Sequence, residues 1–307
     1  MNLPNVSIII PMYNNEKYVD LCLKSIFSLE YPDKKMELIV VDNGSTDSSV
    51  EIVKKYPLKV VSCPIGNISK VRNAGAAVAK GTVLAFVDSD CVVGPSWLST
   101  TVNILERPRV VATGSGYRLP KDAKWVEKIW LRQSKIEERE VKFIPSGNFI
   151  VKADAFKEIG GFNESLVTCE DADICERLAR KGFKLIYSTK IHSTHLRNPK
   201  TISEFFRKEM WYGINMTVSL KNQNLDKLFM LTVLFYLSHL LIILSFWWPY
   251  FLLIGILSLL TILNIGTIYK LYFSRKFKCY GHLMVLYYVF LMARGIGIFK
   301  SLLNRAN

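Results

Sequence analysis

The sequence has few cysteines, and their spacing excludes the common cysteine chemistries. The six cysteines include no C-x-x-C pair and no cysteine/histidine spacing typical of a zinc site. The first residues also lack a basic segment followed by a long apolar run, since Val6–Ile10 is too short for a signal peptide. We therefore expect this part of the chain to stay in a reducing compartment, with its cysteines as free thiols.

Acidic residues are almost absent from the last quarter of the chain. From Leu225 onward, eight lysines and arginines accompany the single acid Asp226 in a mostly apolar stretch. Basic residues beside apolar runs are typical of cytoplasmic flanks that face anionic lipid. A protein of net charge +14 could instead bind nucleic acid, but no basic face interleaved with aromatic residues is visible. We predict a membrane partner and no nucleic acid.

Composition excludes several further classes of protein. Half of the 307 residues are hydrophobic, and the mean hydropathy is +0.19, above the range usual for soluble domains. A disordered chain and a collagen-like or disulfide-stapled scaffold are both excluded by this composition. The length is that of one large or two ordinary domains, with an apolar segment outside an aqueous fold.

The first two thirds of the chain alternate short apolar runs with helical patterns. Between the first two runs, apolar residues from Val19 to Ile26 recur at the spacing of an amphipathic helix. Strands that alternate with helices predict an α/β fold with a mostly parallel sheet. The runs of strand length are Val6–Ile10, Leu38–Val41, Lys59–Ser62 and Val83–Val87.

Polar loops follow three of these predicted strands. They are Pro11–Asn15, Asp42–Asp47 and Asp88–Asp90, and each carries carboxylate or amide side chains. Because ligands bind beyond the carboxyl ends of parallel strands, these loops predict a site along one edge of the sheet.

The same loops contain candidate helix caps. We expect Asn14 or Asn15 to cap the first helix, and Ser45 or Thr46 to cap the second.

The middle of the chain predicts further short elements. The charged stretch Lys121–Glu140 is predicted to form a surface helix, and Ser146–Val151 a strand. Helices are predicted over Ala153–Ile159 and over Asp171–Lys181, the second ending at a glycine. The helix predicted at Thr201–Leu220 either lies at a membrane surface or packs on the domain.

Two apolar runs near the C-terminus are long enough to span a membrane. They are Leu228–Phe246 and Phe251–Tyr269, separated by an uncharged aromatic turn and followed by the basic loop Lys270–Lys278. A third run, Leu283–Phe299, is shorter and contains Arg294, so it either spans or lies against the first two helices. We expect a globular domain at 1–224 and a membrane anchor at 225–307.

Several motifs occur in a characteristic order along the chain. The segments VSIIIPMYNNE at 6–16, LIVVDNGSTD at 38–47 and FVDSD at 86–90 are followed by SGNF at 146–149, GGFNE at 160–164 and Glu170-Asp171. Together these segments resemble glycosyltransferase family 2 over roughly residues 5–215. The resemblance implies a GT-A fold and transfer of a sugar from a nucleotide diphosphate with inversion.

The resemblance implies a metal and nucleotide site. Asp88 and Asp90 are expected to hold Mg²⁺ or Mn²⁺ through carboxylate oxygens, with phosphates completing the coordination. Asp42 resembles the carboxylate that holds the nucleoside. The further residues expected to bind nucleotide or donor sugar are Pro11, Tyr13, Asn14, Arg72, Ser89, Gly147, Asn148, Glu170 and Arg197.

Inverting transfer needs a base that removes the proton of the attacking hydroxyl. Asp171 matches the family base, although acids in a first helical turn also serve as dipole partners. His195 falls where relatives place a histidine near the metal or the diphosphate, and a structural role is the alternative.

One departure from the family is informative. Members that polymerise sugars carry a Q-x-x-R-W motif, whereas here the stretch Arg207–Trp211 keeps only the tryptophan. We therefore predict transfer of a single sugar, with a UDP-sugar favoured, to a lipid-linked saccharide or other glycan acceptor. Polyprenyl phosphate is the alternative acceptor.

The alternatives from other functional classes are a nucleotidyltransferase and a non-catalytic membrane scaffold. We expect a multi-pass membrane protein with a cytoplasmic catalytic domain.

Overall fold

The computed structural model describes residues 3–131, 137–166, 168–219, 227–274 and 279–306, which divide into two compact units. The sheet unit comprises residues 1–120 and 133–197, and the helical unit comprises residues 121–132 and 198–307. The boundary expected at residue 224 stays a prediction about the membrane anchor. The compact units divide the chain elsewhere, because α5 (Trp125–Trp130) and α8 (Ile202–Ser219) share an apolar cluster with the C-terminal helices.

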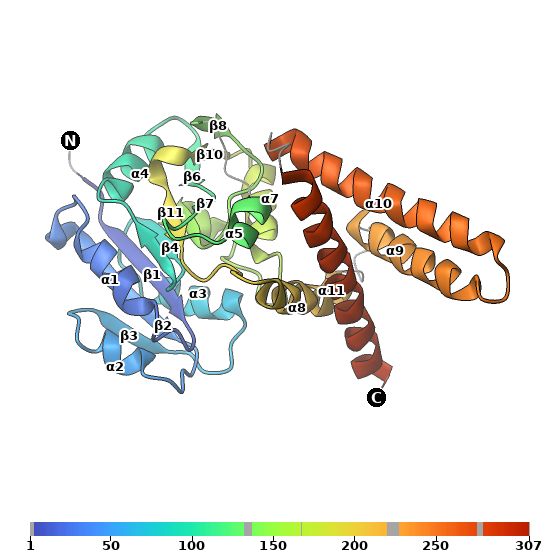
Figure 1. The fold of residues 1–307 in the computed structure, drawn as a ribbon. Coiled ribbons are helices and arrows are strands. Elements are labelled where there is room, and N and C mark those ends of the chain that lie inside the picture. The colour runs from blue at the N-terminus through green and yellow to red at the C-terminus, as the bar shows by residue number, and fades with distance from the viewer. Residues whose placement is uncertain (1–2, 132–136, 167, 220–226, 275–278, 307) are drawn as a thin grey trace. The chain divides into compact units, whose positions relative to one another are not determined.

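An eight-stranded sheet forms the centre of the sheet unit (Figure 1). Its strand order is β3-β2-β1-β4-β9-β6-β10-β8. The first four strands in this order run parallel, as do β6 and β10, whereas β9 and β8 are antiparallel to their neighbours. The predicted α/β class with a mostly parallel sheet is confirmed. The strands are β1 Val6–Met12, β2 Met36–Asp42, β3 Lys59–Ser62, β4 Val83–Val87, β6 Val110–Gly114, β8 Glu138–Glu140, β9 Asn148–Lys152 and β10 Lys184–Ser188.

Helices cover both faces of this sheet. Side chains alternate along each strand, so Ile8 and Ile10 of β1 enter one apolar cluster and Ile9 enters the other. Because both faces are covered, the strands read in the sequence as continuous apolar runs. The first face carries α1 Val19–Phe27, α2 Ser49–Val53 and α4 Trp97–Leu105, and the second carries α3 Ile68–Ala77, α6 Ala153–Glu158 and α7 Glu170–Arg180.

A second, three-stranded sheet lies beside the carboxyl end of β4. It is formed by β5 (Cys91–Val93), β11 (Ser193–His195) and β7 (Tyr117–Arg118). In its antiparallel register, His195 pairs with Cys91. Two short 3₁₀ helices complete the unit, at Asp33–Lys35 and Thr189–Ile191.

The predicted helix caps are wrong. The residues at the cap positions of α1 and α2 are Tyr18 and Ser48, and neither side chain makes a capping hydrogen bond. Asn14 and Ser45 instead join their two loops, because the Asn14 main-chain N–H donates to the Ser45 hydroxyl over 3.0 Å. These polar residues at strand ends form hydrogen bonds with the neighbouring loop and do not cap the next helix.

The helix predicted over Lys121–Glu140 is also wrong in its extent. α5 ends at Trp130, since Leu131 adopts an extended conformation. Residues 132–136 lie outside the described residues, and Glu138–Glu140 form β8, which pairs with β10 at the sheet edge. Pairing with a distant strand overrides the local helical preference of this charged stretch.

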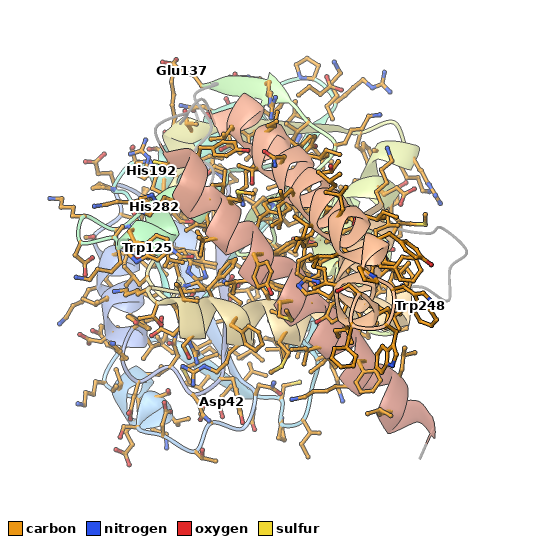
Figure 2. The ribbon with its side chains drawn as sticks, turned by 45° about the vertical axis from the view of Figure 1, so that its right-hand side comes forward. Asp42, Trp125, Glu137, His192, Trp248 and His282 are labelled. Carbon is orange, nitrogen blue, oxygen red and sulfur yellow. The ribbon has the colours of Figure 1, made fainter. Side chains whose placement is uncertain are left out.

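Three long apolar helices follow α8 in the helical unit. They are α9 (Lys227–Leu244), α10 (Tyr250–Ser274) and α11 (Tyr280–Ala306), and each is long and apolar enough to cross a membrane. The third predicted run therefore belongs to a full-length candidate span. Trp248 lies in the turn that joins α9 to α10 (Figure 2). Of the predicted basic loop, 270–274 belongs to α10 and 275–278 lies outside the described residues.

α8 and α11 pack closely within the helical unit. A side chain on Gly297 would overlap the carbonyl oxygen of Met210 and lie 2.8 Å from the nitrogen of Ile214. Beside this crossing, Arg294 of α11 donates to the buried Glu209 carboxylate of α8 at 2.8 and 2.9 Å. The charge inside the third apolar run therefore has a partner of opposite sign.

We expect Gly297→Ala to force α8 away from α11. Overpacking of this kind lowers the free energy of unfolding by about 1–3 kcal/mol. Gly281→Ala, at the start of the same helix, meets nothing within 4 Å and gains helix propensity, so it should be neutral or stabilising. Thermal unfolding of both variants in the same detergent tests this crossing. Equal melting temperatures would contradict it.

Candidate functional site

The three polar loops meet at one edge of the large sheet. They follow β1, β2 and β4, whose parallel pairing places their carboxyl ends side by side. The side-chain Oδ1 of Asn14 accepts the Thr46 main-chain N–H over 2.8 Å, and the side-chain Nδ2 of Asn15 donates to the Ser89 hydroxyl over 2.7 Å. The structure confirms the predicted grouping and shows that direct hydrogen bonds hold it.

Asp42 organises the loop after β2. Its buried carboxylate accepts hydrogen bonds from the main-chain N–H groups of Gly44 and Ser45 at 3.1–3.3 Å. Asn14 has a left-handed backbone, with φ of 44°, which aims its amide at this loop. Pro11 is buried in β1, whereas the Tyr13 side chain beside it is 56% exposed. Of the residues expected around a nucleoside, Tyr13 presents the accessible ring.

A buried arginine joins three segments of the site. Arg72 of α3 is 3% exposed and donates to Asp88 Oδ1 over 2.8 Å and to Glu170 Oε1 over 2.9 Å. Ser146 also donates to Glu170 Oε1, over 3.0 Å. Burial lowers the pKa of the Arg72 guanidinium, but the two carboxylates outweigh burial and hold that pKa above its ordinary value. Arg72 therefore fixes the β4 loop and the start of α7 together.

Gly147 lies directly against Asp88. The Asp88 main-chain N–H donates to the Gly147 carbonyl over 3.3 Å, and the Tyr117 hydroxyl donates to Asp88 Oδ2 over 3.4 Å. A Cβ atom on Gly147 would overlap both Asp88 Oδ2 and the Tyr117 hydroxyl. Only glycine leaves room here for the Asp88 carboxylate.

Four potential metal ligands converge beyond β4. One ligand atom each from Asp88, Asp90, Cys91 and His195 lies within 4.8 Å of the others. His195 reaches this group through the small sheet, and its Nε2 lies 3.5 Å from Asp90 Oδ1. Burial raises the pKa of the Asp90 carboxyl, which His195 partly offsets. Two partly buried carboxylates that attract positive charge are a favourable setting for a cation.

The chemistry of these donors suits a hard divalent cation. Carboxylate oxygens and imidazole nitrogen are suitable ligands for Mn²⁺, and carboxylates for Mg²⁺. Burial raises the pKa of the Cys91 thiol well above its usual range, and a soft sulfur ligand suits Mg²⁺ and Mn²⁺ poorly. Asp88 also shares its oxygens with Arg72 and Tyr117, whereas Asp90 faces His195 directly. Asp88, Asp90 and His195 are therefore the residues that fit a metal.

Asp171 stands next to this network, in the first turn of α7. Its neighbour Glu170 bonds Arg72, and Asp171 Oδ1 accepts the Ala172 N–H over 2.9 Å. Burial, with a contribution from the charge of Glu170, raises the pKa of Asp171 to about 6. A carboxylate that titrates near neutral pH can accept a proton during a reaction.

Two further predicted donor-site residues are Asn148 and Arg197. Asn148 is fully buried, accepts a hydrogen bond from the Trp97 indole over 2.9 Å, and donates to Ser115 and Ile191 over 2.8 Å. These hydrogen bonds hold the Asn148 amide inside the fold, and the role of Asn148 at the donor sugar stays a prediction. Arg197 is exposed, and its charge lowers the pKa of Asp90.

The sequence analysis missed Tyr117, Ser146 and Cys91. Tyr117 supports Asp88, and its ring packs against His195 with centroids 4.9 Å apart. No local pattern marks Tyr117, because its contacts join segments far apart in the chain, whereas Ser146 begins the SGNF motif but was not named as a site residue. Cys91 could have been noticed, since it follows Asp90 directly.

Comparison with known proteins identifies a family and a fold. A model of the family described as glycosyl transferase family 2 matches residues 7–160. Glycosyltransferase AglE of Haloferax volcanii is 27% identical over 226 residues, which are 69% of this chain and 72% of AglE. In two further curated relatives, the match covers only 34% and 48% of the relative's own length.

Solved structures share the fold. Mannosyltransferase PcManGT from Pyrobaculum calidifontis, in complex with GDP-Man and Mn²⁺, has a TM-score of 0.63 at 17% identity, covering 99% of this chain and 89% of that one. GalNAc-T7 with UDP, GalNAc and Mn²⁺ has a TM-score of 0.54 at 20% identity, covering 69% of this chain and 50% of that one. At these identities the likeness establishes a GT-A fold.

We expect Gly147→Ala to weaken metal binding about tenfold, because its methyl group displaces the Asp88 carboxylate. Gly94→Ala is a matched control, since its methyl group would meet the His192 ring at an ordinary 3.5 Å. Titration of both variants with Mn²⁺, followed by electron paramagnetic resonance, measures the change. Unaltered Mn²⁺ affinity in Gly147→Ala would rule out this role for the glycine.

Proposed function

This chain belongs to glycosyltransferase family 2, and from that premise we propose that it transfers one sugar, with inversion, from a nucleotide diphosphate sugar to an acceptor at a membrane. One observation carries the proposal. Asp88, one of three candidate metal ligands, shares Arg72 with Glu170, and burial raises the pKa of the next carboxyl group in the chain, Asp171, to about 6. Inverting transfer needs both a site for a diphosphate and a proton acceptor.

The donor is proposed to be a nucleoside diphosphate sugar. Two solved structures of the same fold contain Mn²⁺, one with GDP-Man and the other with UDP and GalNAc. Among nucleotide sugars, a UDP-sugar is the donor that we favour. The buried Asp42 loop and the exposed ring of Tyr13 are the residues proposed to receive the nucleoside, whose identity the binding experiment below determines.

Each residue of the site has a separate role in the proposed reaction. Asp171 accepts the proton of the acceptor hydroxyl as that oxygen attacks the anomeric carbon. The bond from the anomeric carbon to the diphosphate breaks, and its electron pair leaves with the phosphate oxygen. Asp88, Asp90 and His195 would hold a divalent cation, which would supply positive charge to stabilise the leaving diphosphate. Arg72 keeps Asp88 and Glu170 in place through its two ion pairs.

The acceptor is proposed to be carried by a membrane lipid. Three helices of the chain are long and apolar enough to span a membrane, and basic residues accompany them. This pattern supports a multi-pass protein with a cytoplasmic catalytic domain. A lipid-linked saccharide and polyprenyl phosphate are the two candidate acceptors. They differ in chemistry, because the phosphate is already ionised and needs no base.

Nucleotide binding tests the donor site without knowledge of the acceptor. We expect one of UDP, GDP, dTDP and CDP to bind the purified full-length protein tightly with Mn²⁺, and Asp90→Ala to weaken that binding at least tenfold. Asp154→Ala removes an exposed carboxylate of α6 and should leave affinity unchanged. Calorimetry with and without Mn²⁺ measures the effect. Absence of metal-dependent binding to all four nucleotides would defeat the proposal.

The pH profile tests Asp171. Because the folded pKa is about 6, the proton is lost as pH rises, so log kcat/KM should climb with unit slope below pH 6 and level off above it. Asp171→Asn should abolish the step and cut transfer by at least a hundredfold. Asp173→Asn, in the same helical turn and paired with Arg177, should keep the profile. Near-normal turnover of Asp171→Asn would remove the base and favour a phosphate acceptor.

A further inference from the structure

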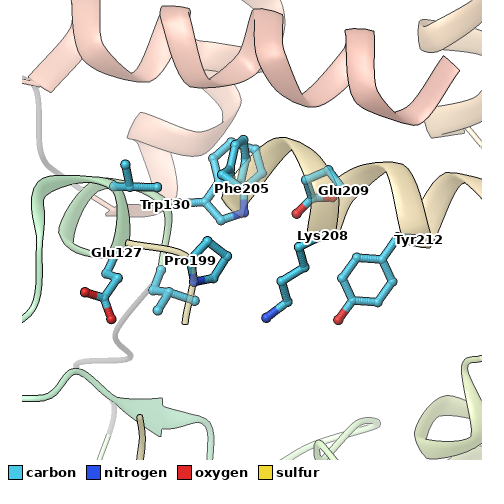
Figure 3. Close-up of a pocket in the computed structure, with 9 residues that line it drawn as sticks. Glu127, Trp130, Pro199, Phe205, Lys208, Glu209 and Tyr212 are labelled. Atoms are coloured by element: carbon cyan, nitrogen blue, oxygen red, sulfur yellow. The ribbon is translucent and has the colours of Figure 1, made fainter. Parts of the chain in front are cut away.

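The helical unit contains a pocket of its own, between α5 and α8 (Figure 3). Its volume is about 170 Å³, room for several water molecules at about 30 Å³ each. The wall combines aromatic and charged side chains, and the polar ends of Glu127, Lys208 and Tyr212 point to the same side. All of its lining residues belong to the helical unit.

Glu127 is an unusual part of this wall. The residue is 1% exposed, and its Oε2 accepts the main-chain N–H of Lys124 over 2.7 Å at the start of α5. Within the described ranges, its Oε1 is buried and has no hydrogen-bond partner. A buried carboxylate oxygen without a donor is costly, so this atom points to a ligand that supplies a hydrogen-bond donor.

The rest of the pocket limits the chemistry of that ligand. The charge of Glu209 is balanced by Arg294, while Trp130 and Phe205 form an aromatic wall with ring centroids 4.7 Å apart. Lys208 is the one cation among the lining residues. An anion such as phosphate is bound best where several cations converge, which this lining does not offer.

We propose that this pocket binds a pyranose ring of the acceptor saccharide. A sugar ring supplies hydroxyl donors, one of which would donate to Glu127 Oε1, and it also has an apolar C–H face that packs on the aromatic wall. The pocket belongs to the same unit as the three candidate spans, so a glycan carried on a membrane lipid would be held near its anchor. This inference rests on the proposed function and names its acceptor class as a saccharide rather than a bare phosphate.

Saturation-transfer NMR on the full-length protein tests the pocket. The probes are the methyl glycosides of glucose, galactose, mannose and N-acetylglucosamine, and the protein is held in phosphatidylcholine nanodiscs to avoid sugar detergents. We expect at least one glycoside to bind and Glu127→Gln to weaken it about tenfold. Glutamine keeps the capping bond to Lys124 but places a donor where the unpaired acceptor stood. Glu204→Gln, exposed on α8, should bind like the unaltered protein.

Two further measurements separate the possible failures. Binding of the nucleotide diphosphate with Mn²⁺ should be the same in Glu127→Gln and the unaltered protein, which also shows that the variant is folded. Tyr212→Phe, which removes one polar group of the lining, is a second variant and should weaken glycoside binding while sparing nucleotide binding.

The outcomes distinguish this inference from the function on which it rests. If the unaltered protein does not bind any of the nucleotides, the proposed function itself is wrong. Normal nucleotide binding with no glycoside bound, or with equal glycoside affinity in Glu127→Gln, would overturn the saccharide pocket alone. Binding of glycerol phosphate that is lost in Lys208→Ala but kept in Glu127→Gln would likewise overturn it, in favour of an anionic head group.

Discussion

The ion pairs of Arg72 are the constraint on which the rest of the site depends. A guanidinium that is 3% exposed has left water, and two carboxylates compensate that loss. One of them, Asp88, leads to the metal ligands, and the other, Glu170, fixes the turn that contains Asp171. A single buried cation on α3 thus sets the positions of the groups proposed to bind the diphosphate and to accept the proton.

The sequence allowed much of the sheet unit to be predicted, for a physical reason. A strand buried on both faces is a continuous apolar run, so Val83–Val87 was placed to the residue. The loops after parallel strands must share one sheet edge, and this located Asp42 and Asp88. Local sequence signals failed where contacts between residues far apart in the chain determine the structure, as at β8 and at the helix caps.

The candidate site likewise contains residues that a local motif reveals and residues that only the folded chain brings together. Asp88, Asp90 and Arg72 could be named because their motif is local in the chain, and the structure places them together. Tyr117 could not, because only the folded small sheet brings it to His195. The partner of Arg294 was equally hidden, since Glu209 lies 85 residues earlier in the chain.

That separation along the chain has a consequence for how the protein is made. Glu209 is synthesised well before Arg294, so the carboxylate of α8 has no partner from α11 until the last helix leaves the ribosome. The glycine contact between α8 and α11 is equally delayed. The helical unit therefore completes its assembly last, and a chain cut short before α11 lacks the Arg294 partner of Glu209, a defect that cellular quality control can recognise.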